Sequence, residues 1–141
     1  MNDRGLYILI IRLKKGQAIK IGRFQEAYFK AGYYLYVGRA RRGLRVRIER
    51  HLRVEKKTFW HIDSFLSKAQ IIEVLIRPGS FDECRMACRL RQLLRNSVVP
   101  VPGFGASDCR CPGHLIYLSE KQDWKAVISV LKTALGLRTY P

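Results

Sequence analysis

Arg47 and His51 are the residues of this chain whose type and position point most clearly to chemistry. Leu44, Ile48 and Leu52 recur every four residues, which predicts a helix with those three side chains facing the core. Arg47 and His51 fall three and seven residues after Leu44, so they face inward or along the edge of the same stripe. A cation placed against a core is costly unless an anion comes to meet it. We therefore expect this helix to present both side chains to a phosphate.

Two tyrosines each lie two residues from a glycine at the end of a predicted strand. Tyr7 lies in an apolar strand that opens at Gly5, and Tyr36 ends another strand just before Gly38. Near a divalent metal ion and an arginine, the pKa of a tyrosine can fall far enough for its oxygen to accept a proton from water. The alternative is that both are ordinary buried tyrosines whose hydroxyls reach the surface.

Glu83 has two readings. Ser80-x-x-Glu83 has the form of a capping box, in which the carboxylate only satisfies backbone donors at a helix start. Glu83 also heads a stripe with Ala87, Leu90 and Leu94, which directs it toward the interior. Mg²⁺ and Mn²⁺ prefer oxygen ligands and can be held by one carboxylate together with water and a substrate phosphate. Glu83 is therefore either a helix-capping carboxylate or a candidate ligand for one such ion.

The remaining basic residues of this region predict a surface for a polyanion. The chain has 27 Lys and Arg against 11 Asp and Glu, a formal net charge of +16, and arginine outnumbers lysine. Such a field attracts nucleic acid, although a membrane surface or a ribosome would also carry the matching charge. We expect backbone contacts that position the nucleic acid without reading its sequence, against the alternative of a merely solvated face. The residues concerned are Arg39, Arg41, Arg42, Arg50, Arg53, Lys56 and Lys57.

Length and composition predict one globular domain over residues 1–141. Hydrophobic residues make up 48% of the chain, which argues against disorder, and no apolar run is long enough to span a membrane. No signal-type apolar core follows the first residues, so we expect a cytoplasmic protein. DNA is the expected partner and RNA a second candidate, while the sequence predicts no oligomeric state.

Four cysteines raise the alternative of a zinc site. Cys84 and Cys88 are one helical turn apart in an apolar pattern, which favours small core residues. Cys109-x-Cys111-x-x-His114 is more suggestive of metal, but it lacks the paired C-x-x-C spacing of zinc ribbons and fingers. Structural zinc is therefore the less favoured reading.

Local patterns predict the order of the elements. Strands are expected over 5–13, 18–22, 33–37, 70–76 and 114–118, and helices over 44–53, 60–66, 80–95 and 119–136. The first of these four helices follows a strand closed by Gly38, and the last stops at Gly136. Residues 23–32 are ambiguous between a short strand and a loop. Residues 96–112 form a loop long enough to be a functional candidate.

Taken in order, these motifs resemble the GIY-YIG endonuclease superfamily. Gly5-Leu6-Tyr7 stands where Gly-Ile-Tyr would, and Tyr36-Val37-Gly38 stands where Tyr-Ile-Gly would. Trp60-His61-Ile62-Asp63, Glu83-Cys84 and the segment 104–111 are similar to the Uri-type branch, whose members also occur fused to endonuclease III in some archaea. The resemblance implies an α+β fold with a three-stranded, or slightly larger, antiparallel sheet flanked by helices. It also implies hydrolysis of a nucleic-acid phosphodiester with one divalent metal ion.

The resemblance assigns roles by position. Tyr7 and Tyr36 would line the site, one of them helping to activate the attacking water, while Arg47 would stabilise the phosphate and Glu83 would hold Mg²⁺ or Mn²⁺. His51 matches a histidine that often follows the family arginine. Supporting roles fall to Gly38 and His61, and Asp63 reads as structural.

Two features depart from the family pattern. The segment between Tyr7 and Tyr36 is longer than the usual hairpin, which predicts an insertion or an extra strand. The asparagine near the end of many family domains has no clear counterpart, and Ser107 and Asp108 are the candidates for its place.

The sequence therefore predicts a metal-dependent endonuclease acting on DNA, in repair or recombination. A non-catalytic nucleic-acid-binding module on the same fold is the alternative from another functional class. A zinc-stabilised structural protein is the third reading, and it requires zinc on Cys109, Cys111 and His114.

Overall fold

A computed structural model of the chain describes residues 3–21, 25–53, 61–79, 82–104, 113–119, 121 and 123–141. Several residues singled out by the sequence lie outside these ranges, namely Lys56, Lys57, Trp60, Ser107, Asp108, Cys109 and Cys111.

The sheet is built around β1 (Gly5–Leu13), as expected for the most apolar run of the chain. It lies between β4 (Gly32–Ala40) and β5 (Gln70–Pro78), with β6 (Leu115–Ser119) beside β4 and β7 (Arg138–Thr139) beside β5. All these pairs are antiparallel. Within the described residues the sheet thus has five strands, which agrees with the expected antiparallel sheet of three strands or slightly more.

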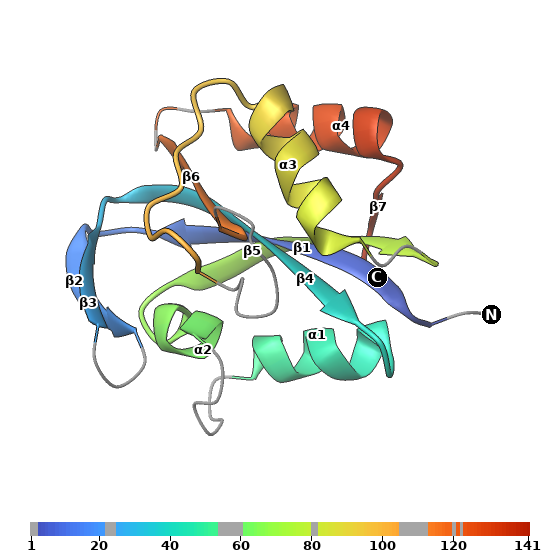
Figure 1. The fold of residues 1–141 in the computed structure, drawn as a ribbon, viewed down its shortest axis with the longest axis horizontal. Helices are drawn as coiled ribbons and strands as arrows, with labels where there is room; N and C mark the ends of the chain where they lie inside the picture. The colour runs from blue at the N-terminus through green and yellow to red at the C-terminus, as the bar shows by residue number, and fades with distance from the viewer. Residues whose placement is uncertain are drawn as a thin grey trace.

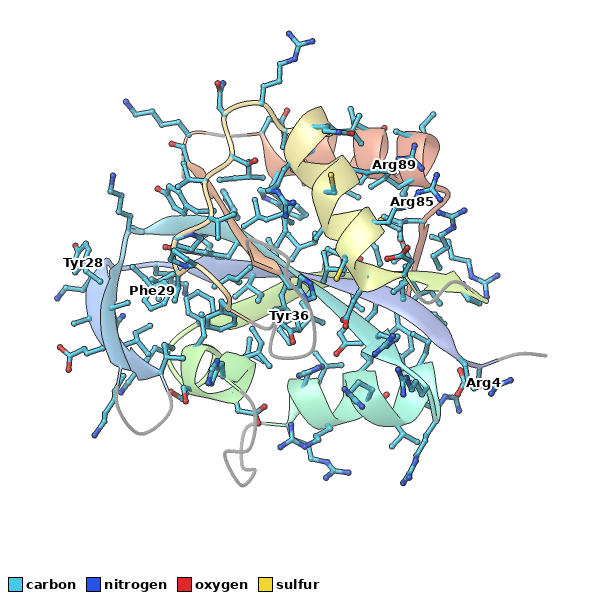
Figure 2. All side chains as sticks on the ribbon, in the orientation of Figure 1. Arg4, Tyr28, Phe29, Tyr36, Arg85 and Arg89 are labelled. Carbon is cyan, nitrogen blue, oxygen red and sulfur yellow. The ribbon has the colours of Figure 1, made fainter. Side chains whose placement is uncertain are left out.

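The long segment between Tyr7 and Tyr36 forms a second, two-stranded sheet. Strands β2 (Gln17–Ile21) and β3 (Gln25–Phe29) pair antiparallel beyond the point where Leu13 of β1 meets Gly32 of β4. The predicted insertion is therefore confirmed, and the ambiguous segment contains a strand. Figure 2 shows Tyr28 directed outward from this hairpin and Phe29 inward, in agreement with exposures of 67% and 0%.

Helices cover both faces of the sheet (Figure 1). Helices α1 (Leu44–Leu52) and α2 (His61–Leu66) lie on one side, and α3 (Glu83–Leu93) and α4 (Trp124–Leu135) lie on the other. Alternate residues of a strand point to opposite faces, so β1 must be apolar throughout. Its even-numbered residues from Leu6 to Ile10 join the core with α3 and α4, and its odd-numbered residues from Tyr7 to Leu13 join the core with α1 and α2.

The buried face of α1 differs from the predicted stripe of Leu44, Ile48 and Leu52 at the C-terminal end of the helix. Leu44, Ile48 and His51 are buried, whereas Leu52 is 43% exposed. Eight residues of an α-helix turn through about 800°, which leaves Leu52 roughly 80° from Leu44. His51 therefore takes the inward position that the pattern assigned to Leu52.

The starts of α3 and α4 differ from the predictions. Asp82 caps α3 by accepting from the Arg85 amide at 3.0 Å, so Glu83 is the first helical residue and not a capping-box carboxylate. Asp123 caps α4, which begins at Trp124 and not at residue 119, because Ser119 is the last residue of β6. The expected stop at Gly136 is confirmed, with φ of 64° in the left-handed region.

Strand β4 is also longer than expected, because it continues beyond Gly38 to Ala40. The carbonyl and amide groups of this extension still have β1 as a partner, since Gly38, Arg39 and Ala40 pair with Tyr7, Leu6 and Gly5. Over the part of the chain that the structure describes, no helix has the length and apolar character needed to cross a membrane.

Candidate active site

The candidate site forms at the edge of β4 that β6 does not pair with among the residues that the structure describes. Strand β6 pairs with β4 only as far as Tyr36, which faces Leu115, and the Val37 amide then donates to the His114 carbonyl at 3.0 Å. In the described residues, β4 from Gly38 onward pairs only with β1. The start of α3 and the inward face of α1 can therefore meet around this edge from opposite sides of the sheet. Figure 2 shows Tyr36 between the N-terminal end of α3 and α1.

The glycines of the two motifs provide clearance. Tyr7 faces Gly38 across the β1–β4 pair, and a Cβ added to Gly38 would lie 2.2 Å from Cζ of the Tyr7 ring. A Cβ added to Gly5 would lie 2.5 Å from the backbone oxygen of Arg77 in β5. Real Cβ atoms essentially never make contacts that short. The absence of a side chain at Gly38 therefore leaves room for the Tyr7 ring, and its absence at Gly5 leaves room for the backbone of β5.

Tyr7 connects β1 with the two inward polar residues of α1. Its hydroxyl lies 2.8 Å from Nε2 of His51, and both side chains are almost fully buried. The Arg47 guanidinium also donates a hydrogen bond to the Tyr7 hydroxyl. The rings of Tyr7 and Tyr36 both contact the His51 ring, with centroids 5.4 and 6.2 Å apart. The structure thus brings together four of the five predicted catalytic residues in one contact network.

The pKa values of both tyrosines move opposite to the direction predicted for a base. Burial raises the pKa of Tyr7 well above its usual value, and the nearby charge and hydrogen bond of Arg47 only partly oppose this. Burial likewise raises the pKa of Tyr36, with further increases from Tyr7 and Glu83. Arg47 by itself therefore does not lower the pKa of either tyrosine, because desolvation of the phenolate exceeds the effect of one guanidinium. The lowering expected from a metal ion and an arginine together stays a prediction.

Glu83, the fifth predicted residue, reaches this network from α3. Its Oε1 lies 3.9 Å from Nη2 of Arg39, and its Oε2 lies 3.7 Å from Nδ1 of His114. The Glu83 side chain is 20% exposed, while Ala87 and Leu90 behind it are buried as the stripe predicted. Its charge acts on both Tyr7 and Tyr36.

Arg39 therefore occupies a place that the sequence did not predict. We expected it on the backbone-binding surface, but it lies beside the candidate metal ligand. The reason is the strand period: Val37 and Arg39 point to the α3 side of β4, whereas Tyr36 and Gly38 point to the α1 side.

Arg50 also differs from the other basic residues. It donates two hydrogen bonds to the carboxylate of Asp63, at 2.9 and 3.0 Å, and the Asp63 side chain is 1% exposed. This bidentate pair joins α1 to α2. It confirms that Asp63 is a structural residue, and it gives Arg50 the same structural role. His61, by contrast, is exposed, and its ring lies 5.9 Å from that of Phe104. His61 and Asp63 therefore diverge, as their spacing predicted.

The other predicted nucleic-acid contacts keep an accessible surface. Arg41, Arg42 and Arg53 are exposed around α1. The two lysines of this set and the two candidates for the missing asparagine lie outside the described residues.

His114 is the site residue that the sequence analysis placed in a different context. It is fully buried, with Nδ1 facing Glu83 and Nε2 at 3.7 Å from the Cys84 sulfur. In the sequence, His114 is marked only by its position in Cys109-x-Cys111-x-x-His114, a pattern that suggests a less favoured zinc site and not a residue beside Glu83. Cys84 is half-buried, and Cys88 is exposed, so the expectation of two core cysteines is wrong for Cys88.

The Glu83 carboxylate suits a hard divalent ion whose other ligands are water and substrate phosphate oxygens. Among the residues that the structure describes, no group of three or more His, Cys, Asp or Glu side chains is arranged to hold a metal ion. Mg²⁺ needs no such cage, since it commonly keeps several waters and binds one or two carboxylates together with phosphate oxygens. The partly exposed carboxylate of Glu83 fits that requirement.

Comparison with known proteins gives one match. A family model described as "Domain of unknown function DUF123" matches residues 6–137, a span that contains every residue of the contact network and Glu83. No curated protein matches the chain, and no solved structure matches it either.

Proposed function

The chain belongs to the DUF123 family, which is GIY-YIG-like, and on that premise we propose that it is a metal-dependent endonuclease that hydrolyses DNA phosphodiester bonds. We further propose the finer placement in the Uri-type branch, a role in repair or recombination, and a cytoplasmic location.

One observation carries the proposal. Tyr7, Tyr36, Arg47, His51 and Glu83 come from four separate elements, and all meet at the open edge of β4. A core does not require this combination, since buried polar and charged groups cost free energy unless they are paired. Such clusters are typical of catalytic sites, where the polar groups are retained for chemistry.

The arginine supplies the first requirement of the reaction. Displacement at phosphorus builds negative charge on the non-bridging oxygens and on the leaving oxygen. Arg47 lies beside Tyr7 with a guanidinium that can donate two parallel hydrogen bonds to a phosphate. Its anchoring to the Tyr7 hydroxyl orients the guanidinium before substrate arrives.

Glu83 supplies the second requirement. It would hold Mg²⁺ or Mn²⁺, which, when bound, adds positive charge at the scissile phosphate. Arg39 and His114 flank the two oxygens of its carboxylate and so limit its rotation. Because Arg39 is itself partly exposed, its guanidinium can also reach a neighbouring phosphate.

The third requirement is a proton acceptor for water. With raised pKa values, neither tyrosine serves as a preformed phenolate. Tyr7 can instead accept a proton from water while its own hydroxyl proton passes to Nε2 of His51, 2.8 Å away. The imidazole then carries the positive charge, and the phenol is neutral before and after the step. Tyr36 would orient the water or phosphate without titrating.

Cleavage assays with one variant test the metal assignment. Glu83→Ala should lose cleavage of branched, nicked and single-stranded DNA in Mg²⁺ or Mn²⁺ while keeping most of its DNA binding in EDTA. The matched control is Glu26→Ala, which removes an exposed carboxylate from the β2–β3 hairpin. Cleavage by Glu83→Ala at the parent rate would contradict the role of Glu83.

The alternative is a non-catalytic nucleic-acid-binding module. Both functions predict salt-sensitive binding through residues such as Arg41, Arg42 and Arg53, so binding alone does not separate them. Absence of product from the parent protein with every DNA and RNA substrate, in either metal, would favour the binding module.

A further inference from the structure

The β2–β3 hairpin presents to solvent a tyrosine that the proposed hydrolysis does not use. Tyr28 of β3 is 67% exposed, and Figure 2 shows it directed away from the molecule. Of the Phe, Tyr and Trp residues that the structure describes, it alone is exposed. One exposed apolar side chain needs no explanation by itself. The way in which this ring is held, and the charges beside it, therefore carry the argument.

The Tyr28 ring is held over a glycine. A Cβ added to Gly16 would lie 2.5 Å from the Tyr28 hydroxyl oxygen and 3.2 Å from Cζ of its ring. Gly16 is not among the described glycines with positive φ, so its backbone does not require glycine. Ala18, another small residue, pairs with Tyr28 across the hairpin. The ring can therefore lie across the start of β2, and at 67% exposure one of its faces stays open to solvent.

The opposite face of the hairpin is anchored in the core. Phe29, next to Tyr28, is fully buried. Its ring centroid lies 5.0 Å from that of Phe65 in α2 and 6.1 Å from that of Tyr34 in β4. The Tyr34 hydroxyl also donates to the Lys30 carbonyl at 2.6 Å. These contacts fix the end of β3, so the Tyr28 ring is oriented before any ligand binds.

Positive charge accompanies the exposed ring. The hairpin and the segments at its base carry four exposed lysines, namely Lys14, Lys15, Lys20 and Lys30. Glu26 is the acidic residue of this region, and it pairs with Lys20 in the half of the hairpin farther from the base. The other three lysines belong to the base, where Tyr28 also lies. This end of the hairpin therefore favours a negatively charged partner.

A ring face beside lysines suits unpaired nucleic acid better than the other possible partners. Unpaired bases stack on aromatic side chains, while basic residues hold the phosphates that connect them. A duplex covers its base faces by its own stacking and so offers this ring only backbone. A second copy of the chain would bring the same positive charge to the contact.

We propose that the base of the β2–β3 hairpin binds a single-stranded DNA segment, with a base stacked on Tyr28 and flanking phosphates on Lys14, Lys15 and Lys30. Strand β4 runs six residues from Gly32, at the hairpin end, to Gly38 at the candidate site, which is roughly 20 Å. About six stacked nucleotides cover that length. The preferred substrate is then DNA with a single-stranded arm. This preference rests on the proposed function, whereas binding at the hairpin does not.

Binding of the whole chain to labelled oligothymidylate in EDTA tests the stacking. Tyr28→Leu should bind about 5–150-fold more weakly, whereas Tyr28→Phe keeps the ring and should stay within about twofold of the parent. An abasic oligonucleotide of the same length has the phosphates without the bases, so the parent and Tyr28→Leu should bind it equally. Equal binding of oligothymidylate by the parent and Tyr28→Leu overturns the proposal. A loss in Tyr28→Phe as large as in Tyr28→Leu also overturns it.

Salt dependence tests the lysines. The double variant Lys14→Gln/Lys15→Gln should reduce the slope of log K against log salt by about 1.4, because each lost phosphate contact on a single strand contributes about 0.7. Lys125→Gln/Lys132→Gln is the matched control, since both lysines are exposed on α4, and its slope should equal that of the parent. Equal slopes in the two double variants contradict the phosphate contacts.

Two further measurements address folding and self-association. Tyr28→Trp keeps a stacking ring, and oligothymidylate should quench its added fluorescence while the abasic oligonucleotide should not. Absence of quenching in this folded variant overturns the proposal. Sedimentation of the parent and of Tyr28→Leu should give the same mass. A parent dimer that becomes a monomer in Tyr28→Leu would show that a second copy covers the ring, which also overturns it.

Cleavage of forked and of fully paired nicked DNA separates this inference from the proposed function. Tyr28→Leu should raise KM for the forked substrate, leave kcat unchanged, and cleave the paired substrate like the parent. An unchanged KM for the forked substrate would contradict the hairpin site and leave the endonuclease in place. Binding of oligothymidylate that depends on Tyr28, by a parent that cleaves no substrate, would support the hairpin site and contradict the endonuclease.

Discussion

Toward α3 and α4 the sheet carries mostly aliphatic side chains such as Ile8 and Leu35, whereas toward α1 and α2 the same strands carry Tyr7, Tyr34 and Tyr36. The rings of Tyr7 and Tyr36 there contact the buried His51. Both faces are packed, and β1 contributes three buried residues to the core with α3 and α4 and four to the core with α1 and α2. Apart from His114 and Arg39 beside the start of α3, the face toward α3 and α4 can be understood from hydrophobic burial alone. The face toward α1 combines burial with hydrogen-bonded polar groups, whose desolvation lowers the net stability gained there.

The difference between the faces shows where this fold can hold chemistry. The polar groups are not spread over the α1 face but concentrate toward the end of β4 that β6 leaves unpaired. There the start of α3 adds Glu83 and Arg39 faces it, so residues from both sides of the sheet share one edge. We therefore expect substitutions on the two faces to separate stability from cleavage.

The largest effect should come from Tyr7→Phe. Loss of the hydroxyl removes the group between water and His51, and we expect cleavage to fall about 10²–10⁴-fold. Tyr34→Phe is the matched control, since Tyr34 is buried on the same face but donates its hydroxyl to the Lys30 carbonyl at 2.6 Å. It should cost about 1 kcal/mol of unfolding free energy and leave the cleavage rate of the folded protein unchanged. Equal losses of cleavage in Tyr7→Phe and Tyr34→Phe would show that the candidate site does not differ from the rest of this buried face.

On the opposite face, Leu131→Ala should affect stability alone. Leu131 of α4 is fully buried, and truncation there should lower the unfolding free energy by about 2–5 kcal/mol. The neighbouring Val130 is 49% exposed, so Val130→Ala should change stability by less than about 0.5 kcal/mol. Urea unfolding measures both changes. A loss of cleavage in Leu131→Ala under conditions where it is fully folded would show that the two faces are coupled.

Arg50→Ala tests which arginines of α1 belong to the fold. Removing the guanidinium leaves the buried Asp63 carboxylate without its forked pair, and we expect a loss of about 3 kcal/mol. Arg45 is exposed on the same helix, so Arg45→Ala should be nearly neutral in thermal unfolding. Similar stability in the two variants would mean that the Arg50–Asp63 pair contributes nothing net.

Gly38→Ala should cost about 1–3 kcal/mol, because the new methyl group overlaps the Tyr7 ring and forces it to move. The same substitution in a Tyr7→Ala background should cost much less, since no ring then occupies the space. Chemical unfolding of the four proteins in this cycle gives the coupling. An unchanged cost in both backgrounds would show that Gly38 serves something other than clearance.

The smallest effect should be a loss of stability at alkaline pH that arises from the α1 face. Burial raises the pKa of Tyr7, Tyr34 and Tyr36. In the unfolded chain these phenols ionise near pH 10, while in the fold they stay protonated, so the unfolded state is favoured as pH rises above about 10. Urea midpoints compared across that pH should fall, and Tyr34→Phe should reduce the fall. A midpoint that does not change would contradict the pKa shifts.

Several parts of the fold and of the candidate site could be predicted because their signals are local. The β1 run, the inward phase of Arg47 and His51, and the stripe behind Glu83 follow from strand and helix periodicity. The element boundaries were less predictable, since Ser80 and Asp82 are both residue types that cap helices and the sequence does not show that Asp82 takes this role. Arg50 could not be told from Arg53 by sequence, because its partner Asp63 belongs to another helix.

By itself the sequence determined which side chains face inward from each strand or helix, because the local periodicity of an element sets the direction of its side chains. Tertiary structure decided which of those faces meet. Pairing of β6 stops at Tyr36, which opens the edge where α1 and α3 converge, and strand alternation then turns Arg39 toward Glu83. Burial decided the protonation of Tyr7, since a phenolate loses its hydration only once the helices cover the sheet. His114 reached Cys84 and Glu83 by the same long-range packing, to which no local pattern in the sequence corresponds.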